Sequence, residues 1–162
     1  MELVPLSLRN VWEIVHLRVT QEQDERDFVA SNGCSVIEAF AAREDGYSAL
    51  PFGLYEGGKP VGFLMIGYGS IGDEDEPSVA QDSYCIWRLM IDARYQGQRL
   101  GKKAMEAALA YIRTWPCGRA SRCWLSYMPE NTAAKALYAR MGFVENGEMD
   151  GDEVVAVLPL NE

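Results

Sequence analysis

The sequence predicts an α/β fold in which a mixed, mostly antiparallel central sheet is flanked by about four helices. Two observations predict this class. Apolar runs of strand-like composition alternate with segments of helical periodicity, and Gly- and Pro-containing turns separate them. The chain has 162 residues, of which 48% are hydrophobic, so it is long and apolar enough to bury one substantial core. We therefore expect a single domain over residues 1–162.

The N-terminal half predicts one strand, two helices and a hairpin. Apolar residues in helical register indicate each helix, and a polar side chain suited to capping precedes it. The turn signal Glu56-Gly57-Gly58-Lys59 lies between two apolar runs, which predicts the hairpin. The expected elements are a strand over 2–6, a helix over 11–19 capped by Asn10, a polar run over 20–27, a helix over 35–43 capped by Ser35, and strands over 52–55 and 60–68.

The C-terminal half predicts four strands and two helices. An acidic loop over 69–82 comes first, and the apolar run after it shows little alternation, which is typical of a buried central strand. Pro116 and Gly118 end the first helix, and Gly142 stands where a left-handed residue ends the second. The expected elements are strands over 83–91 and 122–127, a helix over 100–115, a helix capped by Asn131, and closing strands over 143–149 and 153–158.

Charge and cysteine content limit the classes of function. Fifteen Lys plus Arg against twenty-four Asp plus Glu give a net charge of −9, which repels nucleic acid and favours cationic partners, although it also simply maintains solubility. The apolar runs are too short to cross a membrane, and the N-terminus lacks the basic segment of a signal peptide. With four scattered cysteines and one histidine, we expect reduced thiols, no metal site and a cytoplasmic location.

Residues 89–102 predict a binding site for phosphate. The strand end Leu89-Met90-Ile91 leads into a polar turn, and a helix begins near Leu100. Free backbone N–H groups at a helix start attract anions, and Gly97 and Gly101 let the backbone approach a phosphate closely. An ordinary strand-to-helix turn also uses glycines for tightness. The spacing matches neither a P-loop nor the dinucleotide-binding fingerprint.

Two blocks of the sequence resemble motifs of the GNAT superfamily of N-acetyltransferases. The segment from Leu89 to Lys102 resembles its acetyl-CoA-binding motif, Gln/Arg-x-x-Gly-x-Gly/Ala, although Arg99 stands where the middle glycine is usual. The block Asn131-x-x-Ala134-x-x-Leu137-Tyr138-x-x-x-Gly142-Phe143 resembles its later motif, a helix beside the pantetheine arm. The resemblance implies a GNAT-like domain that transfers the acetyl group of acetyl-CoA, its co-substrate, to a primary amine by direct attack in a ternary complex.

The resemblance also implies roles for particular residues. Tyr138 matches the general-acid position, although without the motif it would be a core aromatic residue of its helix. Asn131 matches a pantetheine contact as well as an N-cap, and Lys135 either reaches a phosphate or is an exposed helix lysine. The other implied coenzyme contacts are Leu89, Met90, Ile91, Gln96, Gly97, Gln98, Arg99, Leu100, Gly101 and Lys102.

The sequence shows no evident general base. Many relatives place an acid on the strand before the motif, but here that strand reads Tyr84-Cys85-Ile86-Trp87-Arg88. Glu38, acting through water, is the candidate, with a first-turn helix acid as its alternative interpretation. Cys85 as an acyl-carrying nucleophile has no base near it in sequence, and His16 lies among apolar residues of the first expected helix.

Within the superfamily, the chain most resembles bacterial spermine/spermidine N-acetyltransferases. The segments that carry this likeness lie within residues 28–39, 88–92, 123–131 and 147–158. The likeness implies a polyamine acceptor and allows a homodimer, with no nucleic-acid or membrane partner. Acidic groups for a polycation are available at Asp24, Glu25, Glu38 and 73–76, and aromatic rings at Trp87 and Tyr127.

Several alternatives stay open at this point. The acidic loop is alternatively a solvated surface segment. The acceptor is alternatively another small amine, an aminoglycoside or a peptide N-terminus. The chain is alternatively a non-catalytic acetyl-CoA-binding module.

Overall fold

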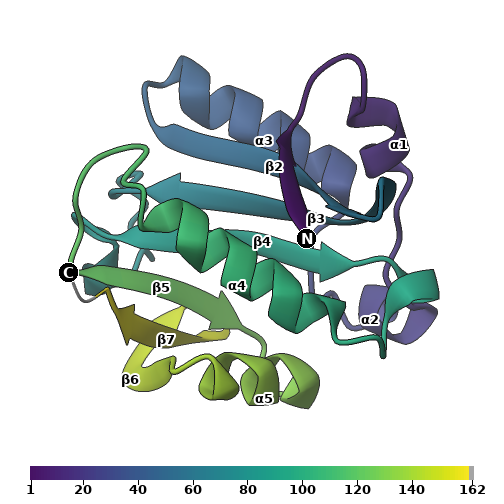
Figure 1. The fold of residues 1–162 in the computed structure, drawn as a ribbon. Coiled ribbons are helices and arrows are strands. Elements are labelled where there is room, and N and C mark those ends of the chain that lie inside the picture. The colour runs from purple at the N-terminus through teal and green to yellow at the C-terminus, as the bar shows by residue number, and fades with distance from the viewer. Residues whose placement is uncertain (161–162) are drawn as a thin grey trace.

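Seven strands form one sheet in the computed structural model, which describes residues 1–160 (Figure 1). Their spatial order is β1-β2-β3-β4-β5-β7-β6, and every neighbouring pair is antiparallel except β4 and β5. The predicted fold class, with its mixed and mostly antiparallel sheet, is confirmed. The strands are β1 (Glu2–Pro5), β2 (Ser48–Glu56), β3 (Lys59–Tyr68), β4 (Tyr84–Ile91), β5 (Arg122–Tyr127), β6 (Val144–Asp150) and β7 (Glu153–Pro159).

The described chain contains five α-helices, one of which lies in the polar run 20–27, where the sequence predicts no helix. This extra helix is a single turn, and it is stabilised by a capping box between Thr20 and Gln23. It buries no residue, so a search for apolar periodicity does not detect it. The helices are α1 (Val11–Val15), α2 (Gln21–Glu25), α3 (Asn32–Glu44), α4 (Leu100–Ile112) and α5 (Thr132–Arg140), with 3₁₀ turns at Ser78–Ala80 and Ala93–Tyr95.

Two of the predicted helix caps are wrong. Asn10 directs its side chain back to the preceding loop, where it accepts the N–H of Ser7 and donates to the carbonyl of Pro5, and α1 ends at Val15. Helix α3 begins three residues earlier than expected because Ser31, not Ser35, accepts a first-turn N–H.

The predicted boundaries of α5 are confirmed. Asn131 accepts the N–H of Ala134 at 3.2 Å, so it caps the helix as expected. Gly142 follows the last turn with φ of +93°, a left-handed conformation that favours glycine.

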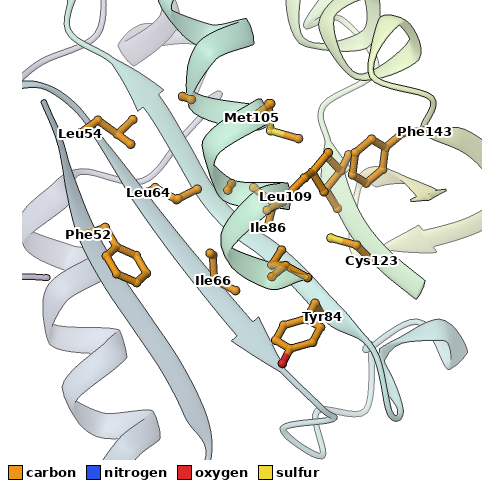
Figure 2. Close-up of a cluster of buried hydrophobic side chains, with 14 of the residues drawn as sticks. Phe52, Leu54, Leu64, Ile66, Tyr84, Ile86, Met105, Leu109, Cys123 and Phe143 are labelled. Carbon is orange, nitrogen blue, oxygen red and sulfur yellow. The ribbon is translucent and has the colours of Figure 1, made fainter. Parts of the chain in front are cut away.

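Apolar side chains pack on both faces of the central strands. Successive residues of a strand point to opposite faces, so Leu64 and Ile66 join the cluster under α4, whereas Phe63 and Met65 join the cluster under α1 and α3. Figure 2 shows the first cluster, with Met105 and Leu109 of α4 lying over the strand residues. This packing fixes α4 against β4 and thereby places the start of α4 at the end of that strand.

The parallel strands β4 and β5 are paired over only two residues. The ladder joins Tyr84 to Cys123 and Cys85 to Trp124, and no further pair joins the described parts of the two strands. On the other edge of β4, the register with β3 shifts so that Trp87 is an extra, bulged residue. The second half of β4 therefore has a partner strand on its β3 side and none on its β5 side.

We predict that Gly62→Ala lowers the free energy of unfolding by about 1–3 kcal/mol in urea denaturation. A Cβ at this position would lie 2.3 Å from the carbonyl oxygen of Met90, and a backbone atom cannot rotate away. Gly33→Ala is the matched control, because its Cβ would meet only Val15 at 3.6 Å. Equal stability of the two variants would contradict the prediction.

Candidate active site

A cleft of about 1260 Å³ opens where β4 and β5 separate. Its walls come from the α2–α3 region, the acidic loop after β3, the start of α4, helix α5 and the turn between β6 and β7. Twelve of the predicted site residues line it together: Glu38, Leu89, Met90, Ile91, Gln96, Gly97, Arg99, Leu100, Gly101, Lys102, Asn131 and Tyr138. The fold thus brings most of the predicted site to one cavity.

Two predicted coenzyme residues, Gln98 and Lys135, lie outside the lining of this cleft. The Nζ of Lys135 is 2.9 Å from a carboxylate oxygen of Glu145, so the structure favours the exposed helix lysine over the phosphate contact. Lys102 does line the cleft, and its Nζ lies 3.4 Å from Glu106 one helical turn later.

The turn between β4 and α4 is held by a buried carboxylate. Asp92 is 3% exposed and accepts the backbone N–H groups of Arg18 and Arg94, each at 3.0 Å, as well as the Nε–H of Arg94 at 2.7 Å. Burial raises the pKa of Asp92, but these hydrogen bonds outweigh it and lower the pKa overall, so the group stays ionised. Asp92 was not among the predicted site residues, and its only sequence signal was its place directly after an apolar strand.

Gln96 closes the turn with its side chain. Its Nε2 donates to the carbonyl of Ile91 at 2.9 Å and to Oε1 of Gln23 at 2.8 Å. Because Gln23 belongs to α2, this contact joins the coenzyme motif to the opposite wall of the cleft. No local pattern in the sequence indicated this long-range pair.

Two residues before α4 adopt left-handed backbone conformations. Gly97 has φ of +76°, and Arg99, at the position where the motif usually has glycine, has φ of +60°. The arginine therefore keeps the backbone shape of the motif, at a steric cost of roughly 1–2 kcal/mol. Arg99 is the N-cap residue of α4, but its side chain makes no capping hydrogen bond.

Gly101 has a packing role in addition to the one expected. A Cβ at this position would lie 3.3 Å from a methyl carbon of Leu137, so the glycine sets how closely α4 approaches α5. The residues at this end of the cleft fit a coenzyme. A helix start without a side-chain cap attracts phosphate, and the unpaired edge of β4 offers backbone groups to the amides of a pantetheine arm.

Tyr138 of α5 both packs among aromatic residues and lines the cleft, so its position is compatible with a core aromatic residue and with a general acid. Its ring packs against Tyr127 and Phe143, with centroids 5.7 Å and 6.2 Å apart, and the residue also lines the cleft. Burial, and secondarily the charge of Glu153, raise the pKa of Tyr138 well above its usual value. The phenol is therefore protonated at neutral pH, as a proton donor must be.

Glu38 lines the cleft in an ion pair with Arg88. Its Oε2 lies 3.0 Å from Nη2 of Arg88, and its side chain is 41% exposed. Because α3 begins at Asn32, Glu38 lies in the second turn of the helix and not in the first. Its role as a base stays a prediction.

Two carboxyl groups that the sequence did not single out also line the cleft. Asp150 and Glu153 flank the turn between β6 and β7, and both contact the hydroxyl of Ser126 on β5. Burial is the main cause that raises the pKa of each group, and the charge of Asp150 raises that of Glu153 further. The sequence indicated only a turn here, because the pairing of β5 with β7 that places Ser126 beside them is non-local.

The remaining candidates contribute less to the cleft chemistry. Burial raises the pKa of the Cys85 thiol well above its usual value, which leaves it protonated and weakly nucleophilic. His16 lies outside the lining, with Nδ1 beside the carbonyl of Trp12. Within residues 1–160, no cluster of three or more acidic, His or Cys side chains is arranged to hold a metal ion, and no helix is long and apolar enough to span a bilayer.

Comparison with known sequences identifies the family. The profile of the acetyltransferase (GNAT) family matches residues 11–143. A spermine/spermidine N(1)-acetyltransferase of Bacillus subtilis is 39% identical over 110 residues, which cover 65% of this chain and 67% of that protein. A probable spermine N(1)-acetyltransferase of Bacillus subtilis subsp. natto is 38% identical over the same lengths.

Solved structures share the fold. An aminoglycoside acetyltransferase in complex with coenzyme A has a TM-score of 0.77 at 17% identity, covering 97% of this chain and 93% of that one. The ribosomal-protein-S18-alanine N-acetyltransferase of Escherichia coli has a TM-score of 0.66 at 22% identity, covering 99% and 94%. The profile match over most of its length shows that this chain belongs to the acetyltransferase (GNAT) family and is an N-acetyltransferase with acetyl-CoA as its co-substrate.

Proposed function

We propose that this enzyme acetylates a primary amine of a polyamine, such as spermidine or spermine, by direct attack in a ternary complex. The observation that carries the proposal is the charge of the cleft. Four basic residues line it against seven acidic ones: Arg99 and Lys102 belong to the coenzyme motif, Arg88 is paired with Glu38, and Arg140 lies on α5. The acidic lining residues are Asp27, Glu38, Asp73, Asp75, Glu76, Asp150 and Glu153.

A polyamine suits such a surface for two physical reasons. It is a flexible chain of cations, so carboxylates spread along a wall bind several of its charges at once. Aromatic rings in the same lining, among them Phe28, Trp87 and Tyr127, add cation–π contacts. The two Bacillus subtilis relatives, whose names refer to spermine, support the same class of acceptor.

We further propose how the cleft divides its tasks. The turn before α4 and the first residues of α4 hold the pyrophosphate with Gln96, Gly97, Arg99, Leu100, Gly101 and Lys102, and Leu89, Met90, Ile91 and Asn131 hold the pantetheine. A backbone N–H of β4 faces the thioester oxygen and stabilises the oxyanion of the addition step. Tyr138 gives its proton to the departing thiolate.

An aminoglycoside is the second candidate acceptor. Aminoglycosides also carry several ammonium groups, so the acidic lining favours them for the same electrostatic reason. A non-catalytic coenzyme-binding module is less well supported, because a protonated Tyr138 lines the cleft.

We predict that a thiol-release assay gives the highest kcat/KM with spermidine and spermine, ahead of aminoglycosides and short peptides. Added salt should lower kcat/KM for polyamines, because it screens their attraction to the carboxylates. Turnover of another amine class without turnover of polyamines would contradict the acceptor. Coenzyme binding without thiol release from any amine would contradict the enzyme's proposed reaction.

Arg99→Gly and Arg99→Ala should separate backbone from side-chain effects. Only the glycine variant relieves the left-handed strain, so we expect it to exceed the alanine variant in free energy of unfolding by up to about 1 kcal/mol. Both variants lose the same guanidinium group, so both should weaken coenzyme A binding by a similar factor, about tenfold by calorimetry. A coenzyme affinity equal to wild type in both variants would remove Arg99 from the phosphate site.

Tyr138→Phe should lower kcat by about 100-fold, since general acids contribute at least that much, while coenzyme A affinity stays within about twofold. Tyr111→Phe is the control, because it removes a hydroxyl from a tyrosine that packs on Phe52 outside the cleft lining. Steady-state kinetics and calorimetry measure the two effects. Unchanged turnover in Tyr138→Phe would remove the acid role.

A further inference from the structure

We infer that Glu153, paired with Asp150 through the hydroxyl of Ser126, is the general base that deprotonates the substrate ammonium. This inference rests on the proposed acetylation of an amine and deepens it, because neither the sequence motifs nor the family match supplies the base. Glu38, the base predicted from the sequence, is the alternative that the same experiments test.

The three residues come together because of sheet register. Ser126 on β5 lies opposite Val155 of β7, and Asp150 pairs with Glu153 across the β6–β7 turn. All three line the cleft, as Tyr138 does. The candidate base therefore has access to the same space as the candidate acid.

The contacts among the three residues require a proton. The Oγ of Ser126 lies 3.0 Å from Oδ2 of Asp150 and is also in hydrogen-bond contact with Oε2 of Glu153. A hydroxyl carries one proton, so it can donate fully to only one of two carboxylates. The second contact is satisfied when a carboxyl group carries a proton and donates it to the hydroxyl oxygen. The trio is thus built to hold a proton and to release it.

Burial and the neighbouring charges determine the pH range in which the two carboxyl groups hold that proton. Burial raises the pKa of both carboxyl groups, whereas the charge of Arg88 lowers both. The groups that face Glu153 are Asp150, Arg88, Asp27 and Tyr138, and those that face Asp150 are Arg88, Asp73, Glu76 and Cys85. An exposed glutamate, with a pKa of about 4.3, is a weak base for an ammonium, and a base that titrates closer to neutral pH is more effective.

Glu38 is less suited to the same task. Its carboxylate is paired with Arg88 at 3.0 Å, so a substrate ammonium would have to compete with the guanidinium for the same oxygen. Glu153 also lies close enough to Tyr138 for its charge to raise the pKa of the phenol. The candidate base and the candidate acid are therefore neighbours in the cleft.

The proposed step balances in protons. The Glu153 carboxylate takes one proton from the ammonium and later releases it to solvent. The neutral amine nitrogen attacks the thioester carbon, a C–N bond forms, and the C–S bond breaks. Tyr138 gives its proton to the sulfur and regains one from the nitrogen, which leaves an amide, a thiol and one proton in solution.

The test is the pH profile of kcat/KM for spermidine in Glu153→Gln, Asp150→Asn, Glu38→Gln and the control Asp152→Asn. Asp152 is an exposed acid of the same turn that does not line the cleft. We expect wild type, Asp152→Asn and Glu38→Gln to show a plateau above an acidic limb. Glu153→Gln should fall by about 100-fold at neutral pH and rise tenfold per pH unit, because only amine deprotonated beforehand can react.

A binding measurement gives a second readout that needs no turnover. Calorimetry of spermidine binding in the presence of coenzyme A, in two buffers of different ionisation enthalpy, should show proton release by wild type, since a bound cation displaces the shared proton. The release should disappear in Glu153→Gln and decrease in Asp150→Asn. An acidic limb and a proton release that persist in both variants would overturn the inference. Absence of thiol release by wild type with every amine would instead overturn the proposed function.

Discussion

The active site depends on β4 and β5 being joined over only two residue pairs. A continuous ladder would satisfy the backbone groups of β4 and close the space where the cleft lies. The separation leaves the second half of β4 without a partner strand on one edge. The apolar clusters on both faces of β3 and β4 offset the free-energy cost of these unpaired backbone groups. Helix α4 and helix α5 then border the opening, where we propose that the coenzyme and the amine bind.

The two proposed ligands carry opposite charges, and the fold places basic and acidic side chains in different parts of the cleft. A protein of net charge −9 repels an anionic coenzyme at long range. The groups that oppose this repulsion gather at one end of the cleft, where the start of α4 lies with Arg99 and Lys102. The carboxylates gather on the remaining walls, so the same overall charge that disfavours one ligand favours a cationic second one.

How much the sequence could predict follows from the range of each interaction. The strand, turn and helix start over 84–102 and the Asn131 cap were predictable because their determinants lie within a few residues of one another. Helix α2 was missed because a capping box stabilises it and not an apolar face. The trio at Ser126 and the contact of Gln96 with Gln23 were missed because they join residues 24 to 73 positions apart, whose proximity depends on sheet register and helix placement.

Gly101 has a packing role in addition to the role that the coenzyme motif implies for it. In a motif that binds phosphate, glycine is usually explained by what the ligand requires. Here the missing side chain also sets the distance from α4 to Leu137, the residue directly before Tyr138. The glycine therefore sets the spacing of two helices as well as leaving room for a phosphate. A bulkier residue there would press on the Leu137 side chain, which is adjacent to the proposed acid, so we expect proton transfer to suffer even where the coenzyme binds normally.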